Sequence, residues 1–157
     1  MPLQERTYNQ AIAPETLELI SGRELLIEHL GHWPTFHDFE VVSLTLERAV
    51  VSAVIHDLRA TFFVFDLRKS PDDPERKQGT AEFLFESVDQ VRIDGFNHQN
   101  PITGLSITQT GPLGEQRRFV VQWGGTCMQH EVSFTCGRVA VVRVVDLNPF
   151  RKAFPSL

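Results

Sequence analysis

The segment FVVQWGGTCMQHEVSFTCGRVAVVRVV, residues 119–145, is the part of the sequence that decides the fold class. β-Branched and aromatic residues fill three short runs in it, at residues 119–123, 131–136 and 139–145. Each run has the length and composition of a β-strand, and the glycine pair that follows the first run marks a turn. Strands this short and this close together favour antiparallel neighbours in a sheet.

Similar runs lie upstream, at residues 58–65, 81–85, 88–93 and 102–108. Turn signals such as Asp94-Gly95 and Gly111-Pro112 separate several of them. The sequence therefore predicts an α+β fold that is mostly antiparallel β, either a sandwich or an open barrel-like sheet, with an N-terminal helix packed on it. Neither a repeat nor a composition shift divides the chain, so we expect residues 1–157 to form a single domain.

Two stretches connect or extend these strands. Residues 50–56 are also rich in β-branched side chains, and their period does not decide between one long bent strand with residues 58–65 and a hairpin. Residues 68–79 are polar and contain two prolines, which predicts a surface loop.

The helical signal lies before the strands. Residues 14–20 predict a short helical turn and residues 22–30 a better helix, which Gly31 would end. Ser21 followed by Glu24 has the form of a capping box for the second helix. Leu26, Ile27 and Leu30 would then share its apolar face.

After Pro34 the period changes to that of a strand. Val42, Leu44 and Leu46 alternate with polar residues, which predicts a strand that buries these three side chains on one face.

The composition narrows the class of protein. The 157 residues are 41% hydrophobic and carry a formal net charge of -5, which suits a globular domain and argues against general affinity for nucleic acid. Neither a signal peptide nor a membrane-spanning run is visible, so we expect a cytoplasmic protein with free thiols. Residues 1–94 carry 9 basic and 17 acidic side chains (9 − 17 = -8), and residues 95–157 carry 6 and 3 (6 − 3 = +3). This split suggests either an ordinary solvated surface or an acidic face for a basic partner.

The first cluster of candidate site residues is HWPTFHDFE, residues 32–40. His37 beside Asp38 suggests a metal site or a general base, because a carboxylate can orient an imidazole. Neighbours on an extended chain point in opposite directions, however, so we expect the two side chains not to converge. The other reading is structural, with Trp33 and Phe36 anchoring the helix to the sheet. Glu40 closes the cluster.

The second cluster is GFNHQNP, residues 95–101. Asn97, His98, Gln99 and Asn100 can all donate and accept hydrogen bonds, which suits a tight polar turn. The alternative is a recognition loop, or a hydrogen-bonded partner of His37 and Asp38 if the two clusters meet in space.

Other catalytic patterns are weak or absent. Cys127 and Cys136, with His130 between them, lack the paired short spacings of a zinc site. The sequence contains no nucleophile elbow, no P-loop and no dinucleotide-binding glycine motif. We therefore expect a protein that is not an enzyme and that requires neither cofactor nor metal.

Three of these strings together resemble one family. Residues 31–41, GHWPTFHDFEV, with the Glu47-Arg48 pair after them, are similar to the opening of the bacterial immunity protein 50 family. The GFNHQN string at residues 95–100 and the SFTC string at residues 133–136 also resemble segments of that family, in the same order along the chain. The departures are Thr35 for Ser, Phe39 for Ala, Pro101 for an aliphatic residue, and a longer stretch at residues 49–58. Phe39 would add bulk beside the His-Asp pair and alter the local surface.

The resemblance implies a cytoplasmic protein that binds a cognate bacterial toxin domain and neutralises it by occlusion. The motif residues Trp33, Phe36, His37, Asp38, Glu40, Asn97, His98, Gln99 and Asn100 are then the candidates for partner binding. A basic toxin, such as a nuclease, would be attracted by the acidic part of the chain. Two alternatives stay open: a small metal- or ligand-binding enzyme that uses His37, Asp38 and His98, and a homo-oligomer formed through the Phe-rich strands and the C-terminal tail.

Overall fold

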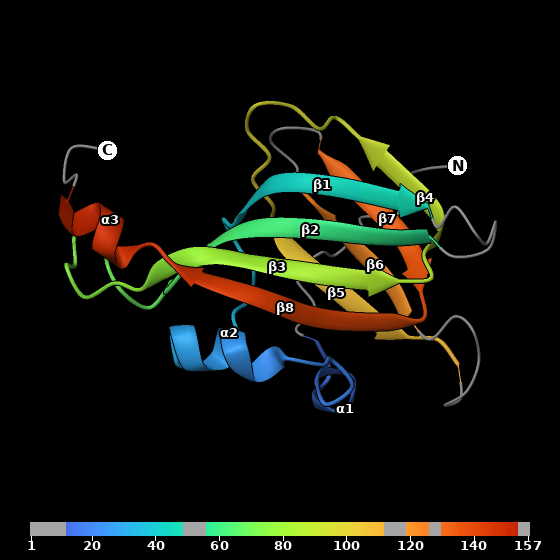
Figure 1. The fold of residues 1–157 in the computed structure, drawn as a ribbon, viewed down its shortest axis with the longest axis horizontal. Helices are drawn as coiled ribbons and strands as arrows, with labels where there is room; N and C mark the ends of the chain where they lie inside the picture. The colour runs from blue at the N-terminus through green and yellow to red at the C-terminus, as the bar shows by residue number, and fades with distance from the viewer. Residues whose placement is uncertain (1–11, 49–55, 112–118, 126–129, 154–157) are drawn as a thin grey trace.

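The computed structural model describes residues 12–48, 56–111, 119–125 and 130–153, and these residues form two four-stranded antiparallel sheets (Figure 1). The first sheet has the order β1-β2-β3-β8 and the second has the order β4-β7-β6-β5. The strands are β1 Glu40–Arg48, β2 His56–Phe65, β3 Gln78–Glu86, β4 Asp89–Asp94, β5 Gly104–Gln109, β6 Phe119–Gly124, β7 Glu131–Cys136 and β8 Arg138–Asp146. The predicted fold class is confirmed. The short strands end at or close to the turn signals of the sequence.

β1 and β2 pair antiparallel, with Arg48 opposite His56. The prediction for residues 50–55 lies outside the described residues. The polar stretch between β2 and β3 is a loop, as expected. Within the described residues, no helix is both long enough and apolar enough to cross a membrane.

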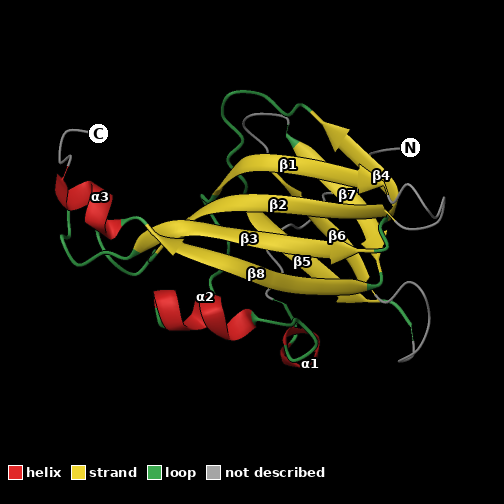
Figure 2. Ribbon diagram, viewed as in Figure 1, coloured by secondary structure: helices red, strands yellow, loops and turns green. Residues whose placement is uncertain are grey.

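The two sheets are continuous at one corner. The β3–β8 ladder ends with Glu86 opposite Arg138, and the β4–β7 ladder begins with Asp89 opposite Thr135. Gly137, between β7 and β8, donates its N–H to the carbonyl of Glu86 at 2.8 Å. Ser87, between β3 and β4, has a φ of 56° and turns its segment in the same place. The β3–β4 and β7–β8 connections therefore run next to each other as they pass from the first sheet to the second. The strands of the two sheets cross at a steep angle, as Figure 2 shows.

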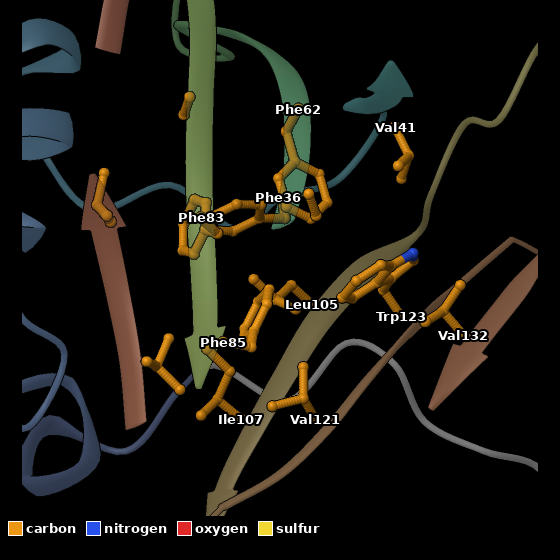
Figure 3. Close-up of a cluster of buried hydrophobic side chains, with 14 of the residues drawn as sticks. Phe36, Val41, Phe62, Phe83, Phe85, Leu105, Ile107, Val121, Trp123 and Val132 are labelled. Atoms are coloured by element: carbon orange, nitrogen blue, oxygen red, sulfur yellow. The ribbon is translucent and has the colours of Figure 1, made fainter. Parts of the chain in front are cut away.

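Aromatic side chains fill the space between the sheets (Figure 3). Phe62 and Phe83 from the first sheet lie 5.4 Å apart between ring centroids, and Phe62 lies 5.4 Å from Trp123 of the second sheet. Phe85 packs edge-on against Phe134 at 4.9 Å. All five rings are buried, and such edge-to-face pairs each add about 1 kcal/mol beyond their buried area.

The helices are α1 Pro14–Leu17, α2 Arg23–Leu30 and α3 Asn148–Ala153. The two predicted N-terminal helical segments are present, and α2 lies beside β8 at the edge of the first sheet (Figure 1). Leu26 and Leu30 are buried, and Gly31 ends α2 with a φ of 83°, as predicted.

The predicted capping box is wrong. Gly22, not Ser21, is the N-cap of α2, and no side chain caps the helix. Ser21 instead forms a parallel bridge to Ala140 of β8: its N–H donates to Val139 at 3.1 Å and its carbonyl accepts from Val141 at 2.8 Å. The backbone of Ser21 is therefore fixed by the sheet, which places Gly22 at the start of the helix.

The prediction for the burial of β1 is also partly wrong. Val41 is 1% exposed, whereas Val42 and Leu46 are 54% and 55% exposed and Leu44 is half-buried. A bulge between Val41 and Ser43 shifts the register with β2, so simple alternation fails at Val42. β1 is also an edge strand, which lacks a neighbour to cover its outer side chains.

Gly22 and Gly31 give a matched pair of substitutions. Both have positive φ, but a Cβ on Gly22 would lie 2.1 Å from the carbonyl oxygen of Val141, whereas on Gly31 it would meet only the Arg68 side chain at 3.2 Å. We expect Gly22→Ala to lower the free energy of unfolding by about 3 kcal/mol and Gly31→Ala by about 1 kcal/mol. Urea denaturation of both variants measures the difference. Equal losses would contradict the contact between Gly22 and β8.

Candidate functional site

The two candidate clusters meet in space. Asp38 donates its N–H to the carbonyl of Ile102 at 2.9 Å, and Ile102 donates to Phe39 at 2.9 Å. Val41 donates to the carbonyl of Asn100 at 3.0 Å, and Glu40 and Pro101 form an antiparallel bridge. Residues 38–41 and 100–102 thus form a short antiparallel ladder, which we call the motif ladder. It covers the first residues of β1.

Asn100 holds this ladder together. It is 3% exposed, and its side-chain Nδ2 donates to the carbonyls of Asn97 at 2.7 Å and Val41 at 3.3 Å. Its Oδ1 accepts from the N–H of Asn97 at 2.7 Å, and its own N–H donates to Oε1 of Glu40 at 3.3 Å. A buried amide with both ends hydrogen-bonded fixes its neighbours, because losing any partner would leave a polar group unsatisfied.

The predicted polar turn at residues 95–100 is present. Asn97 donates from Nδ2 to Gly95 at 2.8 Å and accepts at Oδ1 from the N–H of Gln99 at 3.0 Å. His98 and Gln99 are exposed at the tip of this turn. Asn97 and Asn100 therefore shape the loop, and His98 and Gln99 are polar side chains that the loop presents to solvent.

His37 and Asp38 do converge, so the expectation that they point apart is wrong. His37 Nδ1 lies 3.0 Å from Asp38 Oδ2, and both side chains are exposed. The reason is local: Asp38 has a φ of 62°, so the chain is not extended here. Aspartate tolerates this left-handed conformation better than most residues, a property that the alternation argument ignores.

Trp33 and Phe36 pack on the first sheet, in agreement with the structural reading of these two residues. Phe36 is 1% exposed and lies 5.6 Å from Trp33, 5.7 Å from Phe62 and 5.8 Å from Phe83 between ring centroids. Trp33 itself is only half-buried. Phe39 was expected to alter the surface beside the His-Asp pair, and this is wrong: it is fully buried against Phe36.

The motif ladder separates the residues that a metal or general-base site would need. His37 precedes the Asp38–Ile102 end of the ladder, whereas His98 lies beyond the Asn100–Val41 end. Among the described residues, no three His, Cys, Asp or Glu side chains are grouped so that they could hold a metal ion. What the arrangement does offer is a set of exposed hydrogen-bonding side chains at both ends of a fixed backbone.

A buried histidine lies next to this loop, and its importance is not visible in the sequence. His130 is fully buried; its ring lies 5.5 Å from Phe96, and its Nε2 lies 3.3 Å from Trp123 Nε1. Because an indole N–H can only donate, Nε2 accepts and the ring is neutral. Burial lowers the pKa of His130. The only sequence signal for His130 was its place between Cys127 and Cys136, in a pattern that lacks the spacings of a zinc site.

Cys136 shows no sign of a metal-binding or reactive thiol. Cys136 is free and fully buried, and burial raises the pKa of its thiol to about 12. It is therefore a core residue that stays protonated at neutral pH. Cys127 lies outside the described residues.

A pocket of about 710 Å³ lies where the loop between β2 and β3 meets α2 and α3, and no sequence motif predicted it. Its wall contains Glu28, His29, Leu30, Gly31, Asp66, Arg68, Lys69, Pro74, Glu75, Lys77, Asp146, Asn148 and Pro149.

Several of the charged side chains on this wall form ion pairs with one another. Arg68 holds the buried Asp66 with two bonds of 2.9 and 3.1 Å, and also donates to the carbonyl of Leu30 at 2.9 Å. The hydrogen bonds from Arg68 keep the pKa of Asp66 below its usual range. Lys69 lies 3.3 Å from Glu75. These contacts join the loop to the end of α2.

The charge split seen along the sequence does not become two separate faces. β8, from the basic part, lies beside β3, from the acidic part. Arg138 pairs with Glu86 at 2.7 Å, and Arg143 lies opposite Glu82 in the ladder. The acidic N-terminal part of the chain is therefore not a continuous surface on its own.

Comparisons with protein-family models, with curated proteins and with solved structures found no match. The resemblance to the immunity protein family therefore rests on the three strings themselves.

Asn100 can be tested with an isosteric change. Asn100→Asp replaces the donor that serves Asn97 and Val41 with an acceptor, so we expect the free energy of unfolding to fall by about 3 kcal/mol. The control is Gln99→Glu, the same amide-to-acid change at an exposed position, with an expected change of about 0.5 kcal/mol or less. If both variants unfold at the same urea concentration, Asn100 does not hold the ladder.

His130 predicts a pH dependence of stability. Its folded pKa lies below the unfolded value of about 6.5, so below that pH the unfolded chain binds the proton first. The free energy of unfolding should then fall as the pH falls from 7 to 5, by at most about 1.4 kcal/mol per pH unit. Urea denaturation at pH 5, 6, 7 and 8 measures this slope.

His130→Gln, which retains an acceptor for Trp123, should reduce the slope even if it lowers stability. Gln99→Ala, at an exposed position and without a titratable side chain, should leave the slope as in the wild type. An unchanged slope in His130→Gln would show that the dependence arises elsewhere.

Proposed function

We propose that this chain is a cytoplasmic immunity protein that binds a cognate bacterial toxin domain and neutralises it by occluding a toxin surface. The observation that carries the proposal is the motif ladder. Two strings that resemble one immunity protein family lie about sixty residues apart in sequence, and the ladder joins them into one unit. Some of their polar side chains, Asn97 and Asn100 among them, form hydrogen bonds that hold the unit, and others are exposed and free to meet a partner.

The proposed contact residues are His37, Asp38, His98 and Gln99, which are exposed; Asn97 is also exposed, but its side chain is used in hydrogen bonds within the turn. Their backbone is held by the ladder and by Asn100, so little conformational entropy is lost when a partner binds. Imidazole, carboxylate and amide groups also provide both donors and acceptors, which favours a specific polar contact. Phe36, Asn100 and the half-buried Glu40 support this surface from below.

A basic toxin domain is the partner that fits the net charge of -5 best. Long-range attraction of opposite charges raises the association rate more than it raises the affinity. Because acidic and basic strands lie side by side, this attraction comes from the net charge of the whole molecule.

The test starts from the reading frames that flank the gene: each is expressed alone to find one that is toxic, and that one is then co-expressed with this chain. We expect the wild-type chain to restore growth and to form a complex on size-exclusion chromatography. A variant with His37, Asp38, His98 and Gln99 all changed to Ala should bind at least about tenfold more weakly, which corresponds to about 1.4 kcal/mol. The control is Asp72→Ala, at an exposed position in the loop between β2 and β3, which should bind like the wild type.

Two results would contradict the proposal. If the wild-type chain neither protects nor forms a complex, the chain is not an immunity protein for that toxin. If the fourfold variant is folded and binds as tightly as the wild type, the motif surface is not the contact.

A further inference from the structure

β1 is covered along only part of its outer edge. In the motif ladder, residues 100–102 pair with residues 38–41. Val41 uses both its N–H and its carbonyl in bonds to Asn100. Past the bulge at Val42, the described residues offer no further partner to the outer edge of the strand. Residues 42–48 therefore form an open edge, about 23 Å long at 3.3 Å per residue. Figure 1 shows β1 as the outermost strand of its sheet.

This open edge lacks most of the features that keep edge strands apart. It contains no proline and no lysine, and its only charges are Glu47 and Arg48 at one end. Val42 and Leu46 are more than half exposed. An edge of this length with exposed apolar side chains is a template for pairing with another strand.

The backbone groups available on the open edge follow from the alternation of the ladder. In an antiparallel pair, successive residues point their N–H and carbonyl alternately toward and away from the partner strand. The N–H and carbonyl of Val41 point outward, away from β2. Val41 lies opposite Phe62 and Leu44 lies opposite Ala60, and these two β2 residues are two positions apart, so they have the same orientation. Leu44, Leu46 and Arg48 should therefore also point their backbone groups outward.

The sequence of the open edge is complementary to itself. When two copies of residues 42–48 are aligned antiparallel about Thr45, Leu44 lies opposite Leu46 of the second copy, and the reverse. Thr45 then lies opposite Thr45, and Ser43 opposite Glu47. Leu44 and Leu46 are also the residues with outward backbone groups, so this register gives hydrogen-bonded pairs. No two like charges face each other.

We propose that two copies of this chain pair along residues 42–48 of β1, antiparallel and about a two-fold axis at Thr45, which joins their first sheets into one eight-stranded sheet. The two-fold axis makes the contact closed, so it ends at a dimer. This surface involves residues other than the proposed toxin contacts, and the inference does not depend on the proposed function.

The contact is small compared with a standard interface, which buries about 1,600 Å². We therefore expect a reversible dimer whose population rises with concentration across the micromolar range. Sedimentation velocity on the full chain, between about 1 µM and about 1 mM, measures it.

Thr45 allows a charge-swap test because the axis places it opposite itself. Thr45→Lys and Thr45→Glu each put two like charges face to face, so each variant alone should be a monomer at all concentrations. An equimolar mixture of the two should form dimers again, because Lys then faces Glu. Thr45 is exposed, so neither change disturbs the core. Circular dichroism confirms that both variants are folded.

The controls are Thr108→Lys and Thr108→Glu. Thr108 is an exposed threonine on β5, an edge strand of the second sheet, and both changes should leave the dimer intact. A wild-type chain that stays monomeric up to about 1 mM would overturn the proposal. So would Thr45 variants that dimerise like the wild type, or Thr108 variants that abolish the dimer, since each places the contact on another surface.

Discussion

The packing of Phe36 against Phe62 and Phe83 is the contact on which the arrangement of this protein depends. It places one ring from the segment after α2 against two rings on the inner face of the first sheet, with centroid distances of 5.7 and 5.8 Å. Phe62 in turn contacts Trp123 of the second sheet, so the same group of rings connects the segment after α2 with both sheets. Phe36 has a φ of 64°, a conformation that costs about 1–2 kcal/mol for such a residue. Burial of the full ring offsets that cost.

This anchor explains why the neighbouring polar residues are exposed. With Phe36 and Phe39 both pointing into the core, the chain between them must turn, and Asp38 adopts a left-handed conformation to allow it. His37 and Asp38 are then directed to solvent and brought within 3.0 Å of each other. Asn100 fixes the facing loop in the same way, from a buried position. The polar surface is thus a consequence of buried contacts directly beneath it.

Much of the fold could be predicted from the sequence, because the strands are short, rich in β-branched residues and separated by turn signals. Three features could not. Neither a left-handed Asp38 nor a left-handed Ser87 is expected from a pattern, because both are non-glycine residues whose conformation is imposed by tertiary contacts. The bulge at Val42 depends on register with β2, which alternation alone does not reveal. The pairing of Arg68 with Leu30 joins residues 38 positions apart.

Within the candidate strings, the sequence does not show which side chains are buried and which are exposed. Asn97, His98, Gln99 and Asn100 are equivalent as hydrogen-bonding residues, and only the structure shows that Asn100 is buried while His98 and Gln99 are exposed. His130 illustrates the same limit. In the sequence it stands only between two cysteines whose spacing does not match a zinc site, whereas in the structure its neutral ring contacts Trp123 and Phe96. In both cases burial decides the role, and burial is a property of the whole fold.

The bulge at Val42 lies between the two proposed contact surfaces. Up to Val41 the edge of β1 is regular and pairs with residues 100–102, which orders the loop that carries His98 and Gln99. A bulge increases the local twist and bends the strand, so a segment that pairs on one side of it does not simply continue on the other. The same residue therefore ends the motif ladder and begins the open edge. Removing the bulge would change both surfaces at once. Either residues 100–102 would pair further along β1, or residues 95–100 would lose the register that Asn100 holds.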